Sequence, residues 1–115
     1  MKSTKEVLEH HQQALATANL EEIGKDYTDS SKVLIATLGV HSGKQAILKA
    51  FEGFLPVVKG GDFKVKTLLI AGNAVLLVWD FKSPAATVHD GVDTFFIDNG
   101  VIEYQTTAFN LIRNS

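Results

Sequence analysis

A chain of 115 residues, 45% of them apolar and 21% charged, has the right size for one compact core, so we expect a single domain over residues 1–115. Its net charge of −2, with Lys and Arg scattered along the chain, excludes the basic surface typical of nucleic-acid and anionic-membrane binders, and we expect neither as a partner. The lack of cysteine excludes a disulfide framework, a thiolate metal site and a cysteine nucleophile. The polar start "MKSTKEVLEHH" and the lack of an apolar run of about 18 residues predict a soluble, cytoplasmic protein.

Two capping signals predict helices at the beginning of the chain. Ser3 and Glu6 have the spacing of a capping box, and the apolar residues that follow recur at helical spacing over about residues 4–18. Asn19 repeats the capping signal and opens a short second helix, which Gly24 is expected to end.

The middle of the chain predicts a strand and a third helix. Residues 32–38, "KVLIATL", form a short β-rich run. The stretch "SGKQAILKAFEGFL" follows, with Ser42 as the expected cap and a broad apolar face along the helix. Pro56 is expected to end this helix.

The apolar residues change from helical to strand periodicity in the second half. Tight turns separate four expected strands, at residues 62–71, 74–82, 86–97 and 101–112. Strands joined by tight turns are antiparallel neighbours. Together with the helices they predict an α+β fold in which a curved antiparallel sheet packs against three N-terminal helices.

The last hairpin carries the strongest local signal. Asn99 and Gly100 tolerate the positive φ angles of a type I′ turn, which would set the register of the strands on either side. A regular register from this turn places six residues on the more apolar face, which we expect to be concave: Asp93, Phe95, Ile97, Ile102, Tyr104 and Thr106. Asp93 would then be buried, and a buried carboxylate must be paired, hydrogen-bonded or protonated.

The order of the elements, the "SGKQAI" stretch and the hairpin "VDTFFIDNGVIEYQ" resemble the NTF2-like superfamily, in particular its SnoaL-like and ketosteroid-isomerase-like branch. The resemblance covers nearly the whole chain and implies a conical α+β barrel with an apolar cavity between sheet and helices. By the same resemblance, Asp93 matches the protonated carboxylic acid of the isomerases' oxyanion hole, and His11 stands where these enzymes have a tyrosine. The isomerases' general base is an aspartate on the first strand, and the corresponding run "KVLIATL" has no carboxylate.

The helical periodicity also places His11 on the side of the first helix that faces the expected cavity. This residue shares a face with Leu8 and Leu15, whereas His10 is expected on the solvent side. If His11 and Asp93 meet in the cavity, two interpretations are open: a dyad in which Asp93 orients the imidazole and His11 acts as general base or acid, or a structural hydrogen bond.

Further residues are candidates for contact with a ligand. Regular alternation along the strand would place His89 on the same face as Asp93, unless a bulge, expected near Gly91, turns it to the other face. The other candidates are aromatic or polar side chains that we expect at the cavity: Tyr27, Trp79, Phe95, Tyr104 and Thr106. The four histidines lack metal-ligand spacing such as HxH or HxxxH, so we expect no metal and no cofactor.

The stretches "TLLIA" and "AVLLVW" are apolar on both faces, so the convex side of the sheet also needs a cover. We expect a homodimer that buries outward residues such as Leu76, Val78, Thr94 and Phe96. The expected activity is binding of a small, largely apolar molecule, with proton transfer of the isomerase, cyclase or dehydratase kind. The alternative is a non-catalytic ligand-binding or dimerisation module with a filled cavity, and an open pocket of about 300 Å³ or more at Asp93 would favour the first.

Overall fold

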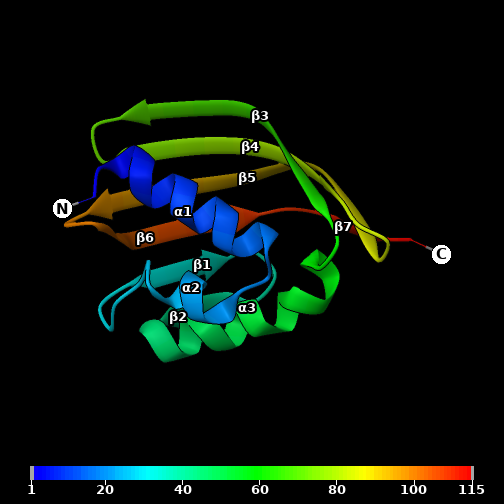
Figure 1. The fold of residues 1–115 in the computed structure, drawn as a ribbon, viewed down its shortest axis with the longest axis horizontal. Coiled ribbons are helices and arrows are strands. Elements are labelled where there is room, and N and C mark those ends of the chain that lie inside the picture. Colours follow the sequence, from blue (N-terminus) through cyan, green and yellow to red (C-terminus); the bar gives the residue numbers. More distant parts are fainter. Residues whose placement is uncertain (1, 115) are drawn as a thin grey trace.

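The computed structural model describes residues 2–114 (Figure 1). The helices are α1 (Thr4–Ala16), α2 (Leu20–Gly24) and α3 (Lys44–Val58). The strands are β1 (Lys32–Ile35), β2 (Gly39–Ser42), β3 (Asp62–Ala71), β4 (Ala74–Lys82), β5 (Ala86–Asp98), β6 (Val101–Ala108) and β7 (Leu111–Arg113).

The strands form one curved sheet of seven strands in the order β2-β1-β6-β5-β4-β3, with β7 added against β5. All pairs are antiparallel except β1 with β6. Figure 1 shows the helices on the concave side of this sheet. The predicted α+β architecture is confirmed, although the sheet is curved without closing into a barrel within residues 2–114.

The predicted caps of the first two helices are present. The Ser3 hydroxyl accepts a hydrogen bond from the Glu6 amide, and the Glu6 carboxylate accepts one from the Ser3 amide, which completes the capping box. The Asn19 side chain accepts from the Glu22 amide at 3.1 Å and caps α2. The α1 helix ends at Ala16, two residues before the predicted end.

Both predicted ends of the third helix were wrong. Ser42 belongs to β2 and pairs with Lys32, so its extended backbone leaves Gly43 as the N-cap. The α3 helix continues past Pro56 to Val58, because the Lys59 amide still bonds to the Leu55 carbonyl at 2.9 Å and closes the last turn. Residues 32–38 are likewise not one strand, since β1 turns back into β2.

A bulge changes the predicted register of the last hairpin. Asp98 pairs with Val101 and Ile97 with Ile102 as predicted, but Phe96 pairs with Tyr104, which leaves Glu103 as an extra residue on β6. Because one extra residue reverses the side-chain parity, the predicted inward placement of Tyr104 and Thr106 was wrong: both are exposed, Tyr104 by 51%. Gln105 and Thr107 take the inward positions, opposite Phe95 and Asp93.

A second bulge removes His89 from the concave face. Trp79 pairs with Gly91 but Phe81 pairs with Val88, so His89 and Asp90 together lie opposite a single residue of β4. Asp90 takes the left-handed conformation with φ of 57°. The bulge expected near Gly91 is therefore present, and it turns His89 away from the cavity, so that this candidate side chain is exposed.

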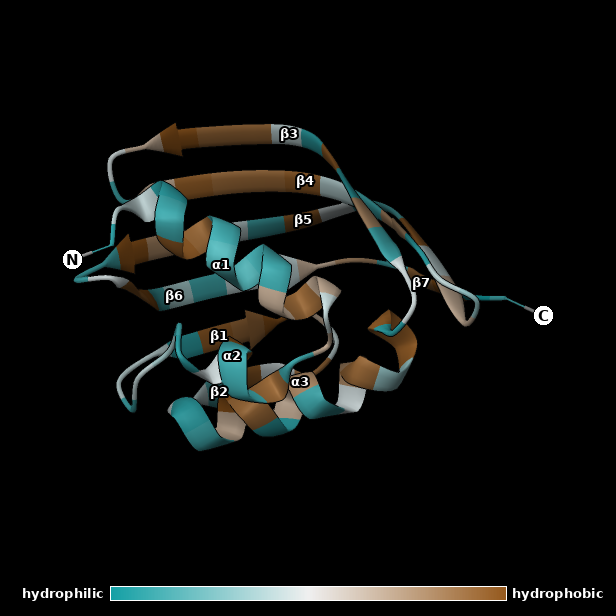
Figure 2. Cartoon of the chain, in the orientation of Figure 1, coloured by the Kyte–Doolittle hydropathy of each residue, from teal (hydrophilic) through white to brown (hydrophobic). Residues whose placement is uncertain are grey.

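The core lies between the concave face of the sheet and the helices. Figure 2 shows that β4 and much of β3 are apolar along their length, as the sequence pattern indicated. The largest fully buried apolar side chains come from both layers: Leu8, Ile23, Tyr27, Ile47, Ile97 and Ile102. Within residues 2–114, no helix combines the length and the apolar character that a membrane span requires.

Candidate functional site

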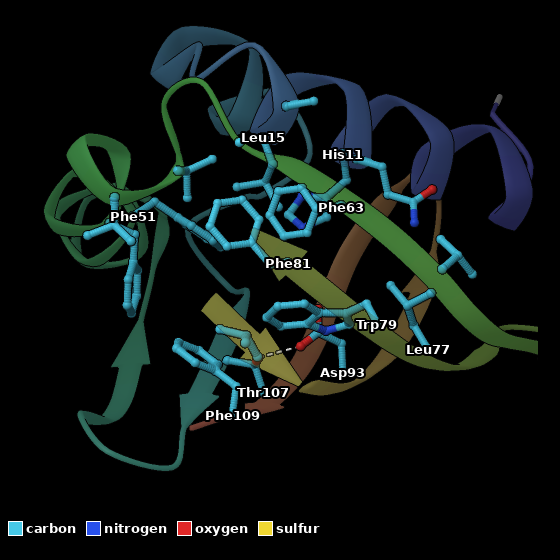
Figure 3. Close-up of a pocket in the computed structure, with 18 of the residues that line it drawn as sticks. His11, Leu15, Phe51, Phe63, Leu77, Trp79, Phe81, Asp93, Thr107 and Phe109 are labelled. Atoms are coloured by element: carbon cyan, nitrogen blue, oxygen red, sulfur yellow. Dashed lines mark hydrogen bonds between the residues drawn. The ribbon is translucent and has the colours of Figure 1, made fainter. Parts of the chain in front are cut away.

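A cavity of about 530 Å³ opens between the concave face of the sheet and the helices α1 and α3. Its walls are mostly apolar and rich in aromatic rings (Figure 3). Phe63 lies 4.6 Å from Phe81 and 5.5 Å from Trp79, measured between ring centroids, and Phe109 lies 5.7 Å from Trp79. The predicted apolar cavity is thus present in the fold, with a volume in the range of small-molecule sites.

Asp93 lies on the cavity wall, where β5 places it between Leu77 of β4 and Thr107 of β6. Only 8% of the residue is exposed, and the Thr107 hydroxyl donates a hydrogen bond to its carboxylate (Figure 3). Burial raises the pKa of Asp93 to about 6, against the opposing effect of the Thr107 hydrogen bond. The nearby indole N–H of Trp79 also lowers this pKa. It is not oriented to form a hydrogen bond, so Trp79 Nε1 has no hydrogen-bond partner within residues 2–114.

His11 reaches the cavity from α1 and is 1% exposed. Its ring packs edge-on against Tyr27, Phe51 and Phe95, at centroid distances of 5.9, 6.0 and 5.5 Å. Neither ring nitrogen has a hydrogen-bond partner among the described residues. Burial, and to a lesser degree the charge of His10, lowers the pKa of His11 to about 4, so the imidazole is neutral at pH 7.

The structure places His11 and Asp93 in one cavity but does not pair them. The carboxylate within ion-pair range of His11 belongs to Asp26, with 4.0 Å between His11 Nδ1 and Asp26 Oδ2. Asp93 is hydrogen-bonded to Thr107 instead. Neither the dyad nor the structural hydrogen bond considered for this pair is formed.

A structural histidine–carboxylate pair does exist nearby, and it involves His10. The Nδ1 atom of His10 lies 2.7 and 2.8 Å from the two carboxylate oxygens of the buried Asp26, and its Nε2 atom lies 3.0 Å from Glu22. These carboxylates, Glu22 first, raise the pKa of His10. The predicted solvent-side position of His10 was wrong because α2 covers that side of α1, leaving the His10 side chain 24% exposed.

The remaining predicted ligand-contact residues fall into three groups. Trp79 lines the cavity, and its indole lies against Gly91, where a Cβ atom would stand 2.5 Å from the ring. Phe95 and Tyr27 are buried in the core beside His11, and the Tyr27 hydroxyl donates to Gln105 Oε1 at 2.5 Å. The residues on the outer surface are His89, Tyr104 and Thr106.

The sequence interpretation missed several residues of the cavity wall. Gln105 and Thr107 were not among the predicted inward residues because the bulge at Glu103 was not foreseen. Phe63 and Phe109 were not singled out, since nothing local distinguishes a cavity aromatic from a core aromatic. Within residues 2–114, no three His, Asp or Glu side chains converge in a way that would hold a metal ion.

Comparison with known proteins gives a family and a fold. The model of the SnoaL-like domain family matches residues 7–105. A comparison with curated proteins finds no significant match.

The similar solved structures include an NTF2-like protein of unknown function from Cytophaga hutchinsonii, with 17% identity, 96% of this chain and 92% of that chain covered, and a TM-score of 0.78. A candidate SnoaL-like polyketide cyclase from Shewanella putrefaciens has 14% identity, coverage of 95% and 80%, and a TM-score of 0.80. A candidate ketosteroid isomerase from Kribbella flavida has 13% identity, coverage of 97% and 81%, and a TM-score of 0.77. At these identities the structures establish the shared fold, while the family match covers most of the chain. The chain therefore belongs to the SnoaL-like domain family and has the NTF2-like fold.

Proposed function

We propose that this protein binds a small, largely apolar carbonyl-containing or cyclic molecule in the cavity and exchanges a proton with it through Asp93. The observation that carries the proposal is an open cavity of about 530 Å³ that reaches a buried carboxyl group and an imidazole without a hydrogen-bond partner in residues 2–114. Binding sites for small molecules are typically apolar cavities of about 300–1,000 Å³ with a few convergent polar groups. The non-catalytic module with a filled cavity is disfavoured by this volume.

Asp93 is the proposed acid–base group. A pKa of about 6 makes both its protonated and its ionised forms accessible near neutral pH. In the ionised form Asp93 takes a proton from the ligand, and in the protonated form it returns the proton to a second position, so that the carboxyl group ends the cycle unchanged.

His11 is the proposed orienting group. Because its imidazole is neutral at pH 7, it offers one N–H donor and one nitrogen acceptor. Both ring nitrogens lack partners within the described chain, so a ligand carbonyl would accept from the N–H without breaking an existing hydrogen bond. The candidate isomerase and cyclase with the same fold are consistent with this kind of chemistry.

The proposal is tested with 2-indanone, whose protons next to the carbonyl exchange with deuterated water at a rate measurable by NMR. We expect the protein to accelerate this exchange, and the Asp93→Asn variant to lose the acceleration because an amide cannot take the proton. Asp29→Asn is the matched control, since Asp29 is exposed and does not line the cavity. Exchange at the wild-type rate in Asp93→Asn would remove Asp93 from the mechanism.

Binding is measured separately by fluorescence. The chain has a single tryptophan, Trp79, and it lines the cavity, so its emission reports occupancy. A ligand that changes this emission in the wild type should bind more weakly to His11→Leu, which keeps the apolar contacts but has no hydrogen-bonding group.

A further inference from the structure

The charged side chains of the cavity wall are all acidic. They are Asp93 inside, and Glu9 and Asp62, which are exposed and therefore lie at the mouth. No Lys or Arg of the described chain lines the cavity, and the single lining histidine, His11, is neutral at pH 7. The cavity therefore presents negative charge with no opposite charge of its own.

The two long helices add to this negative potential. Figure 1 shows α1 and α3 running in the same direction, and the C-terminal turns of both contribute lining residues, Ala16 from α1 and Val58 from α3. A helix C-terminus carries a partial negative charge, and neither helix has a basic residue in its last turn to offset it. Lys59, which follows α3, is exposed and does not line the cavity.

The aromatic wall suits a positive charge as well as an apolar body. The rings of Phe63, Trp79, Phe81 and Phe109 form a continuous series with centroid separations of 4.6 to 5.7 Å. The faces of such rings attract cations. His11, 1% exposed and without a partner in residues 2–114, adds an unprotonated ring nitrogen that can accept a hydrogen bond from an ammonium group.

We infer that the ligand of this cavity is a lipophilic amine: a small, flat apolar body carrying a protonated amino group that pairs with the Asp93 carboxylate and contacts the aromatic wall. The inference rests on the binding part of the proposed function, without its proton-transfer step, and narrows the ligand from a carbonyl-containing or cyclic molecule to a cyclic amine. A cation would compensate the burial of the Asp93 charge, which has Thr107 as its hydrogen-bond partner in the unliganded chain. An anionic ligand, by contrast, would enter a cavity whose charges and helix ends all repel it.

The test uses three probes with the same indane body and different charge: 2-aminoindane, 2-indanol and indane-2-carboxylate, each titrated at pH 7.5 against the Trp79 emission. We expect the amine to bind about tenfold more tightly than the alcohol, and the carboxylate more weakly than both. In Asp93→Asn the amine should lose about tenfold in affinity, while the alcohol should stay within about twofold. Asp29→Asn should leave all three affinities unchanged.

A second variant keeps the test independent of whether Asp93→Asn folds. Phe63 is partly exposed, and Phe63→Leu should weaken binding of the amine more than that of the alcohol because it removes a ring but little apolar area. If the carboxylate binds as tightly as the amine, or the amine keeps its advantage in Asp93→Asn, the inferred ligand class is wrong while cavity binding stands. If neither the three probes nor 2-indanone changes the Trp79 emission, the proposed binding function itself fails.

Discussion

His11 and Asp93 should make the stability of this protein depend on pH in opposite directions, and removing either one should expose the effect of the other. Both side chains are almost fully buried, at 1% and 8% exposure, so burial acts on the charged form of each. The variants are His11→Leu, which restores the apolar stripe of Leu8 and Leu15, and Asp93→Asn, which keeps the shape of the carboxyl group.

The effect of His11 follows from its lowered pKa. The unfolded chain takes up a proton near the ordinary value of 6.5, whereas the folded chain does so only near pH 4. The contribution of His11 to the free energy of unfolding is therefore at its full value above pH 6.5 and is lost as the pH falls towards 4. At about 1.4 kcal/mol for each pH unit of difference, the loss amounts to about 3 kcal/mol.

The effect of Asp93 has the opposite sign. Its pKa is raised from the ordinary value of 3.8 to about 6, so the folded chain holds a proton that the unfolded chain has already released. The contribution of Asp93 to the free energy of unfolding is at its full value below pH 3.8. It decreases by about 3 kcal/mol as the pH rises through 6. In the wild type the two effects largely cancel between pH 4 and 6.

The assay is urea unfolding at pH 7.0, 5.5 and 4.5, followed by far-UV circular dichroism at one fixed protein concentration. From pH 7.0 to 4.5 we expect the free energy of unfolding of His11→Leu to rise relative to the wild type, and that of Asp93→Asn to fall, each by about 2–3 kcal/mol. The pKa shifts of His10 and Asp26 are common to all three proteins, and their effect is removed by taking the difference from the wild type. Curves for His11→Leu and the wild type that stay parallel across this range would refute the reasoning about His11.

Three further predictions concern the outer face and the packing around the cavity. We propose a homodimer through the outer face of the sheet, where Phe96 is 40% exposed; sedimentation should show a dimer at micromolar concentration, and Phe96→Asp should give a monomer. Tyr27→Phe should lower the free energy of unfolding by about 1–3 kcal/mol, measured by urea unfolding, because Gln105 loses its buried donor. Gly91→Ala should lower it by about 1–3 kcal/mol and shift the emission of Trp79, because the new Cβ would stand 2.5 Å from the indole. An unchanged sedimentation coefficient in Phe96→Asp, or an unchanged unfolding curve in either packing variant, would contradict the corresponding prediction.

The elements of this fold could be predicted because their signals are local. The capping box of Ser3 and Glu6 lies within one helical turn, and Asn99 and Gly100 adopt positive φ angles of 53° and 76°, as the expected turn requires. Such signals depend only on neighbours in the chain, so they can be read without knowledge of what packs against them.

The faces of the strands could be predicted only up to the first bulge. Gly91 indicated the bulge at Asp90, but nothing in the residues around Glu103 indicates that an extra residue enters the ladder there, because a bulge depends on the partner strand as well as on its own sequence. Asp93 lies on the predicted face because β5 has no extra residue between Asp93 and the turn, so its side chains alternate regularly between the two faces. Gln105 and Thr107 were misplaced because the extra residue lies on β6, between them and the turn.

The same limit explains why the solvent-side position predicted for His10 was wrong and why the contact considered between His11 and Asp93 is not formed. A helical wheel places His10 and His11 on different sides of α1, but it cannot tell that α2 brings the carboxylate of Asp26 against His10. As a result His10 has the structural partner, while the two ring nitrogens of His11 have no hydrogen-bond partner among residues 2–114.

This distribution of partners is itself an argument for function. A purely structural role would be better served by an apolar side chain at position 11, since a buried polar group without a partner costs about 1–3 kcal/mol. Asp93 likewise carries a carboxyl group between apolar rings, where Thr107 is its single hydrogen-bond partner among residues 2–114. Local departures from packing rules of this kind are expected where a site is prepared for a ligand, because the ligand supplies the missing partners. On this reasoning a ligand that fills the cavity should stabilise the wild type more than His11→Leu, even though the variant is the more stable protein when the cavity is empty.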